Sequence, residues 1–227
     1  MKSIFMIKYF LFLSFICNSL NATAKMYPID IFPSSIQTNC RAGVAKIYDE
    51  CTDQIVILKN ALIKANESKK SVLLVYGAEW CIWCHVFDKY AKGQSRKYDY
   101  EWEYENEKQN WTMHEKENAN VESEAILLNK YISENFVISY IESYYSPNGI
   151  EAINSIGIDG KKIEFYPFFF VLNNQGEYAG HMLPYNAVDG LEKRKDSGEE
   201  FRGFNRKILL EELRELRNKS LKNGKQL

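Results

Sequence analysis

Residues 71–90 read SVLLVYGAEWCIWCHVFDKY, and this stretch decides the fold. Residues 72–76 form an apolar, largely β-branched run that ends at Gly77, which predicts a buried strand. Further on, Val86, Phe87 and Tyr90 place apolar side chains at helical spacing. The stretch therefore predicts a strand, a short turn and a helix, in that order.

Two cysteines, Cys81 and Cys84, fall in the first turn of the predicted helix. The unpaired N–H groups and the positive dipole end of a helix start favour a thiolate over a thiol at Cys81. Cys84 lies one turn further in, close enough to form a disulfide with Cys81, and we expect it to be the more buried of the two. This is the geometry of a dithiol that reacts with other disulfides.

The first 24 residues have the features of a secretory signal. Lys2 and Lys8 flank the start, residues 9–17 form a short apolar core, and residues 22–24 (Ala-Thr-Ala) offer a small-residue cleavage site. We therefore expect residues 1–24 to be a signal peptide and the mature protein to be periplasmic or secreted. No later segment is apolar enough to span a bilayer.

Charge and cysteine content indicate which binding partners and which cellular compartment suit the protein. The chain has 227 residues with 29 basic and 30 acidic side chains, so no basic field favours nucleic acid or an anionic membrane. After the signal, Cys40 and Cys51 remain beside Cys81 and Cys84, an even number that suggests two pairs in an oxidising compartment. We expect a structural disulfide between Cys40 and Cys51, because neither lies in a motif that would activate its thiol. A second redox pair or half of a metal site is the alternative.

The remaining chain alternates helices and strands. We expect an N-terminal extension over residues 25–51, a domain over 52–221 and a polar tail over 222–227. Within the domain, helices are expected after Thr52, over 121–135 and near the C-terminus, with strands at 136–141, 165–172 and 177–181 and a loop over 144–160. This order, closed by a hairpin at residues 173–176, predicts an α/β domain with a mixed sheet flanked by helices.

Residues 93–120 differ in composition from their surroundings and read as an insertion after the active-site helix. Aromatic residues between 98 and 104 alternate with acidic ones, a period of two that could form an amphipathic strand. Such a strip could hold an unfolded peptide or a partner. We favour a surface insertion whose aromatic side chains cover their own patch of core.

Over roughly residues 52–217 the chain resembles the thioredoxin-like superfamily. Within it, the chain is most similar to exported bacterial members, including the C-terminal domain of the periplasmic Dsb-type reductase. The resemblance is carried by the sequences AEWCIWC at 78–84 and FDKY at 87–90, and by Tyr166-Pro167 leading a strand into an Asn-Gln-Gly hairpin.

The resemblance implies a role for each matching residue. Cys81 would be the attacking thiol and Cys84 the resolving one. Pro167 would be cis and lie against the dithiol, and the backbone of Tyr166 would pair with a bound substrate strand. Trp80 and Tyr166 would shape the docking surface.

The chain departs from the family pattern at Val75, where many members carry a buried acidic residue that assists the second cysteine. Asp88, one helical turn after Cys84, could partly serve instead, or could be a solvated carboxylate on the helix face. His85 could stabilise the thiolate when protonated, or could be a plain helix-surface histidine.

The sequence thus predicts an exported thiol-disulfide oxidoreductase that exchanges disulfides with protein substrates and is recycled by a redox partner, without cofactor or metal. The prediction covers both directions of electron flow, because residues between the cysteines tune the potential. One alternative is a c-type haem protein, since residues 81–85 match the haem-attachment motif with His85 as axial ligand. Another is a non-catalytic thioredoxin-like binding module. A zinc site at Cys81, Cys84 and His85 is not expected, because no second Cys/His pair accompanies it.

Overall fold

The computed structural model describes residues 26–43, 45–104, 107–114, 119–182, 185–193 and 200–223. The expected signal peptide and residues 224–227 of the expected tail lie outside the described residues.

A five-stranded sheet forms the centre of the domain, in the order β1-β5-β2-β6-β7. Its strands are β1 (Ile31–Phe32), β2 (Ser71–Gly77), β5 (Phe136–Glu142), β6 (Phe168–Leu172) and β7 (Tyr178–Met182). β1 and β2 run parallel to β5, whereas β6 is antiparallel to β2 and β7 is antiparallel to β6. The sheet is therefore mixed, and the terminal hairpin β6-β7 forms one edge.

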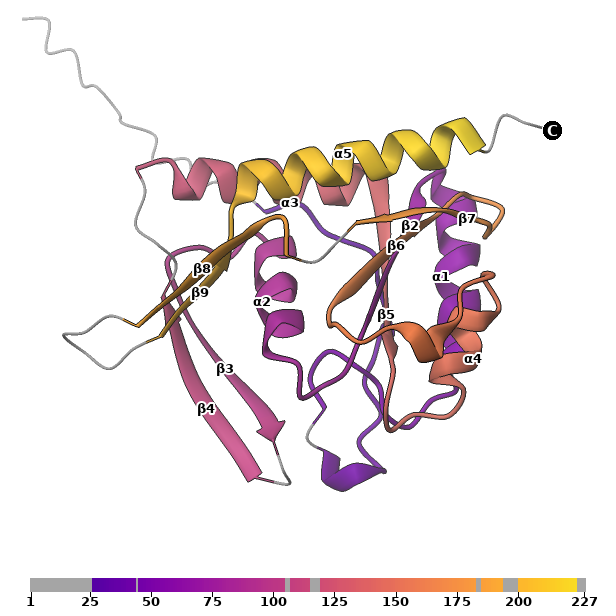
Figure 1. Cartoon of the computed structure of the whole chain (residues 1–227), viewed down its shortest axis with the longest axis horizontal. Coiled ribbons are helices and arrows are strands. Elements are labelled where there is room, and N and C mark those ends of the chain that lie inside the picture. Colours follow the sequence, from indigo (N-terminus) through magenta and orange to yellow (C-terminus); the bar gives the residue numbers. More distant parts are fainter. Residues whose placement is uncertain are drawn as a thin grey trace, which may run out of the picture.

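Helices cover both faces of this sheet (Figure 1). On β2, Val72 and Leu74 pack with α1 (Gln54–Ser68) and α4 (Gly149–Asn154). The alternate residues Leu73 and Val75 pack with α2 (Ile82–Ala91), α3 (Val121–Asn135) and α5 (Arg206–Asn223). Successive side chains of a strand point to opposite faces, so the unbroken apolar run of β2 marks a strand buried on both sides. The predicted α/β class is confirmed: this is a thioredoxin-like fold, with the mixed sheet flanked by helices.

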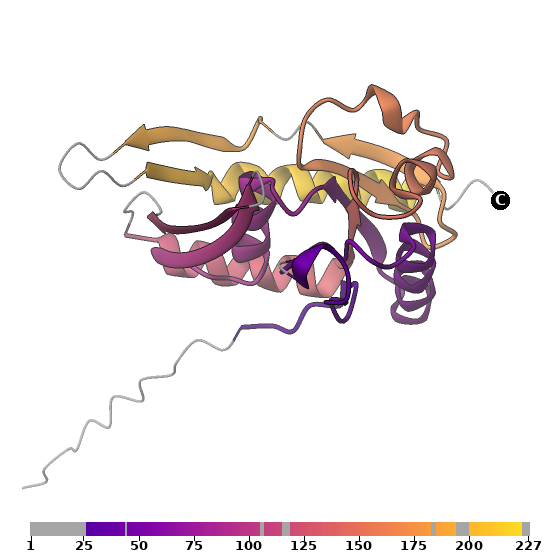
Figure 2. The same ribbon diagram turned by 90° about the horizontal axis from the view of Figure 1, so that it is seen from below.

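A second, four-stranded sheet stands beside α2 and away from the central sheet (Figures 1 and 2). Its order is β3-β4-β9-β8, built from β3 (Lys97–Tyr104), β4 (Glu107–His114), β8 (Val188–Lys193) and β9 (Glu200–Phe204). The predicted insertion thus forms the antiparallel hairpin β3-β4. The β8-β9 hairpin was not expected from the sequence.

Phe204 fixes the end of β9 on the active-site helix. Its ring lies 5.4 Å from Trp83, 5.6 Å from Tyr90 and 6.4 Å from Phe87, each in an edge-to-face arrangement. Phe204 is itself buried. Through this aromatic cluster the second sheet joins the core that surrounds α2.

The structure changes three of the predicted boundaries. The extension at 25–51 is part of the domain, because Ile31 and Phe32 pair with Ile138 and Ser139 of β5. The expected loop at 144–160 contains α4, whose Ala152 is buried against the α1 side of the sheet. The terminal helix continues to Asn223, two residues into the expected tail. A two-residue strand and a six-residue helix are too short for their periodicity to show in the sequence.

Among the described residues, no helix combines the length and the apolarity needed to cross a bilayer.

Candidate active site

Cys81 is the N-cap residue of α2, and its sulfur accepts a hydrogen bond from the backbone N–H of Cys84 at 3.3 Å. The same N–H also donates to the backbone oxygen of Cys81 at 3.0 Å, so the sulfur shares this helix-start donor with the carbonyl group. Both cysteines are free thiols. Both residues are buried, but Cys81 keeps 5% of its surface exposed and Cys84 keeps 0%, so Cys84 is the more buried of the two, as expected.

Trp80, Tyr166 and Pro167 gather at the turn that precedes the dithiol. The rings of Trp80 and Tyr166 meet edge to face at 5.8 Å. The Tyr166–Pro167 peptide bond is cis, as the resemblance implied. Tyr76 pairs with Phe168, so Pro167 lies at the end of β2, where the chain turns toward Cys81. The structure therefore brings these residues to one site.

The inner thiol, Cys84, shares its space with a tyrosine that the sequence did not single out. A Cβ placed on Gly77 would lie 2.6 Å from both the Cys84 Sγ and the Tyr48 Oη. Burial, and then the neighbouring Cys81, raise the pKa of Cys84 well above its usual value, while the Tyr48 hydroxyl acts in the opposite direction. Burial likewise raises the pKa of Tyr48, with Cys84 and Cys81 adding to the effect.

Glu79 holds the chain segment that carries Tyr48. Its buried carboxylate accepts backbone N–H groups from Lys46 at 2.8 Å, from Ile47 at 3.1 Å and from Tyr48 at 3.0 Å. Burial raises the pKa of Glu79 to about 8, although these three hydrogen bonds oppose the shift. Glu79 stands directly before Trp80 in the motif that carries the dithiol, and this position could have marked it as a residue of the site. Tyr48 lies in a stretch without periodicity, and no pattern pointed to it.

His85 is not a surface histidine, so that interpretation was wrong, whereas its action on the thiolate stays a prediction. Its side chain is only 3% exposed, and Nε2 lies 2.6 Å from the backbone oxygen of Glu79. Burial lowers the pKa of His85 below its ordinary value of 6.5, which disfavours the cationic form. The ring therefore joins the start of α2 to the turn before it.

Asp88 is not a solvated carboxylate. It is 4% exposed and accepts hydrogen bonds from Tyr140 Oη at 3.1 Å and from Lys92 Nζ at 2.8 Å. The Tyr140 ring in turn meets the Tyr48 ring edge to face at 5.3 Å. Asp88 thus reaches the surroundings of Cys84 through two tyrosines, and its role as a replacement for the acid absent at Val75 stays a prediction.

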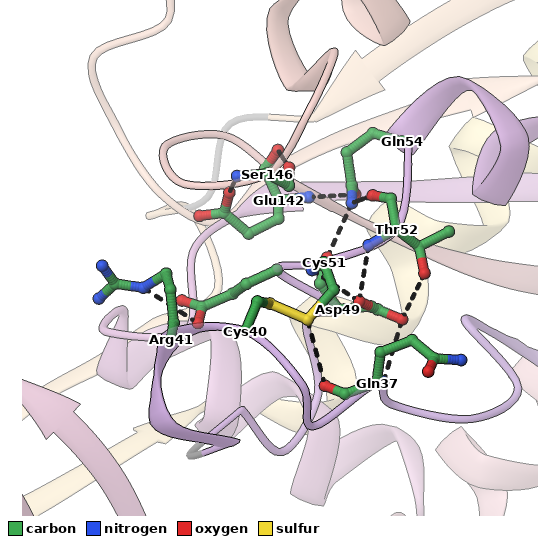
Figure 3. The surroundings of a disulfide bond; sticks show 10 residues. Gln37, Cys40, Arg41, Asp49, Cys51, Thr52, Gln54, Glu142 and Ser146 are labelled. Atoms are coloured by element: carbon green, nitrogen blue, oxygen red, sulfur yellow. Dashed lines mark hydrogen bonds and ion pairs between the residues drawn. A yellow bond between two sulfur atoms is a disulfide. The ribbon is translucent and has the colours of Figure 1, made fainter.

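Cys40 and Cys51 form a disulfide, the structural pairing that we expected (Figure 3). Beside it, Asp49 accepts the backbone N–H of Cys51 at 2.8 Å and both the N–H and the hydroxyl of Thr52 at 2.9 and 2.8 Å. The disulfide and the Asp49 hydrogen bonds close the segment in which Tyr48 lies.

The site does not suit a haem attached at residues 81–85. The Nε2 atom of His85 is engaged by Glu79, and the Cys84 sulfur has no exposed surface for a thioether bond. Within the part of the chain that the structure describes, no three His, Cys, Asp or Glu side chains are grouped so that they could hold a metal ion.

No protein-family model matches the chain, and no curated protein matches it. Among solved structures, the chain is similar to a disulphide isomerase from Xylella fastidiosa Temecula1. The two are 20% identical over 57% of this chain and 73% of that one, with a TM-score of 0.37. The strand order and the position of the dithiol are observed in this chain and do not depend on that likeness. The chain has a thioredoxin-like fold, with Cys81 and Cys84 at the start of the helix that follows the central strand.

Proposed function

We propose that the protein is an exported thiol-disulfide oxidoreductase that exchanges disulfides with protein substrates through Cys81 and Cys84. One observation carries the proposal. Cys81 caps the N-terminus of α2 and is the less buried of the two cysteines, with a second thiol one turn behind it and with Trp80, Tyr166 and Pro167 at the turn that leads to it. A thiolate at a helix start is stabilised by unpaired N–H groups and the helix dipole, and it is the nucleophile in thiol-disulfide exchange.

The reaction proceeds in two steps. The Cys81 thiolate attacks one sulfur of a substrate disulfide, the substrate S–S bond breaks, and the other substrate sulfur leaves with the electron pair. Cys84 then loses its proton and attacks the Cys81 sulfur. The mixed disulfide breaks, and the departing substrate sulfur takes the electron pair and a proton. The substrate gains two electrons, and Cys81 and Cys84 end as a disulfide. The reverse sequence oxidises a substrate dithiol.

The partners follow from this chemistry. A protein substrate would lie along the edge formed by Trp80 and Tyr166, next to Pro167, and a separate redox partner would restore the dithiol after each cycle. The disulfide between Cys40 and Cys51 supports a periplasmic or secreted location, because such bonds persist in oxidising compartments.

Trapping of the mixed disulfide tests the proposal. The Cys84→Ala variant lacks the resolving thiol, so we expect it to form a stable one-to-one covalent adduct with a disulfide-bonded protein substrate, which dithiothreitol releases. The matched variant Cys81→Ala should form no such adduct, because Cys84 is fully buried. Equal amounts of adduct in both variants, or none in either, would contradict the proposed function and favour a binding module.

A further inference from the structure

We propose that Tyr48, held in place by Glu79, donates a hydrogen bond to the Cys84 thiolate when that thiolate forms, and thereby assists the second step of disulfide exchange. This inference rests on the proposed function. Position 75 carries a valine and not an acidic residue, so it cannot assist the resolving cysteine. The inference assigns that assistance to a tyrosine of the N-terminal segment.

The position of the hydroxyl carries the argument. Tyr48 is fully buried, and within the described part of the chain its Oη makes no hydrogen bond, to the neutral Cys84 thiol or to any other group. A buried hydroxyl without a partner costs free energy on the order of 1–3 kcal/mol, so such a group needs an explanation. The explanation here is the adjoining sulfur: Tyr48 Oη and Cys84 Sγ both lie against Gly77, each 2.6 Å from the point where a Cβ would stand, so the two atoms are neighbours.

Glu79 and the disulfide hold Tyr48 in this position before any substrate arrives. The Glu79 carboxylate binds three successive N–H groups, the last of them that of Tyr48 itself. The Cys40–Cys51 disulfide closes the same segment, and the Tyr140 ring packs on the Tyr48 ring at 5.3 Å. The hydroxyl therefore needs no rearrangement to meet a charge that appears on Cys84.

Tyr48 acts as a donor and not as a base. Burial keeps its pKa well above 10, so the O–H stays protonated at every working pH. The other titratable groups described around the pair are Cys81, which caps α2, Asp88 within α2, Glu79 in the turn before it and Tyr140 of β5. A hydrogen bond from a neutral donor to a thiolate favours the charged form of the sulfur.

In chemical terms, Tyr48 stabilises the Cys84 thiolate between loss of its proton and its attack on Cys81. The Cys81–substrate bond then breaks, the Cys81–Cys84 bond forms, and the substrate sulfur leaves with the electron pair and takes up the proton that Cys84 gave up. Tyr48 keeps its own proton throughout.

The test separates the two steps with a chromogenic aromatic disulfide, 5,5′-dithiobis(2-nitrobenzoate), added to the reduced protein in equimolar amount. Attack by Cys81 releases the first equivalent of coloured thiolate, and attack by Cys84 on the mixed disulfide releases the second. In Tyr48→Phe we expect an unchanged first phase and a second phase slowed by about tenfold at neutral pH, since hydrogen bonds to charged groups are the stronger ones. The pH profile of the second phase should also move to higher pH.

Tyr90→Phe is the matched control. Like Tyr48, Tyr90 is fully buried and belongs to the same core cluster, but it lies on α2 six residues after Cys84. We expect both phases to remain at the wild-type rates in this variant. Site-specific 3-fluorotyrosine at position 48 is a second test that keeps the side chain almost unchanged in shape. Its more acidic hydroxyl is a stronger donor, so the pH profile of the second phase should move in the opposite direction.

The outcomes separate the two claims. A wild-type protein that releases no second equivalent contradicts the proposed function itself. A wild-type protein that releases both, while Tyr48→Phe behaves as the wild type or slows no more than Tyr90→Phe, overturns the role of Tyr48 and leaves the proposed function standing.

Discussion

The carboxylate of Glu79 accepts the backbone N–H of Tyr48 at 3.0 Å, across 31 residues of chain. This contact ties the N-terminal segment to the motif that carries the dithiol. It places a buried carboxyl group, two cysteines and a buried tyrosine within one connected site, in a protein whose central strand carries no acid of its own.

Glu79 gives the stability of the fold a specific pH dependence. Its pKa is about 8 when folded and 4.5 when unfolded, so between these values the folded state holds more protons. The free energy of unfolding should therefore fall as pH rises through this window, by up to about 1.4 kcal/mol per pH unit. Glu79→Gln should flatten the profile between pH 5 and 8 in urea unfolding experiments. The exposed Glu67→Gln serves as control and should keep the wild-type slope. A wild-type protein that gains stability from pH 5 to 8 would contradict this assignment.

Gly77 is required because two atoms crowd its Cα. Its alanine variant places a Cβ 2.6 Å from both the Cys84 sulfur and the Tyr48 hydroxyl, so one of them must shift. Overpacking of this kind costs about 1–3 kcal/mol. Thermal unfolding should register that loss, and Gly157→Ala provides a comparison, because no atom lies within 4 Å of a Cβ built there. The positive φ of Gly157 strains an alanine there, so that variant also loses stability. The two variants are therefore distinguished by the rate of the Cys84 step, which we expect Gly157→Ala to leave unchanged and Gly77→Ala to alter. Equal rates in the two variants would argue against the crowding.

The Cys40–Cys51 disulfide should act on stability and not on electron transfer. Replacement of both residues by serine removes a cross-link over 11 residues, for which the loop-closure model gives about 3 kcal/mol. Urea unfolding of the double variant measures this loss. The redox potential of Cys81 and Cys84 should stay within a few millivolts of the wild type. Reduction of Cys40–Cys51 during substrate turnover would instead identify it as a second redox pair.

Phe204 should couple the second sheet to the active-site helix. Its truncation to alanine empties a buried site between Trp83, Phe87 and Tyr90, at a cost of about 3–5 kcal/mol. The fluorescence of Trp83 should change with it, because the indole loses its neighbour at 5.4 Å. Phe165→Ala removes an exposed ring of the same kind and should leave stability nearly unchanged. A Phe204→Ala protein as stable as the wild type would show that the sheet is not anchored there.

Long-period features of the fold could be predicted from the sequence. β2 and β6 are unbroken apolar runs with turn residues beside them, and α2 carries apolar side chains at helical spacing. β1 has two residues, and the six residues of α4 make fewer than two helical turns, so neither shows a pattern in the sequence. The β8-β9 hairpin owes its place to Phe204 packing on α2, a tertiary contact that local sequence does not encode.

The chemistry of the site was only partly predictable. The spacing of Cys81 and Cys84 after a buried strand was sufficient to place the dithiol at a helix start. His85 and Asp88 are buried through contacts with Glu79 and Tyr140, which lie outside α2. The sequence of α2 alone therefore could not show whether these two side chains are exposed or buried. Tyr48 lies beside Cys84 through tertiary contacts such as the hydrogen bond from its N–H to Glu79, which spans 31 residues of chain.

The midpoint potential of the Cys81–Cys84 couple tests the central claim most directly. The protein is equilibrated with dithiothreitol buffers of stepped ratio, quenched by acid and alkylated, and the redox state of each cysteine is counted by mass spectrometry. We predict that Cys81 and Cys84 titrate together as one two-electron couple, with a tenfold change in the ratio of oxidised to reduced protein for about every 30 mV. Two cysteines that remain reduced across the whole range, or that never form a bond with each other, would contradict the account.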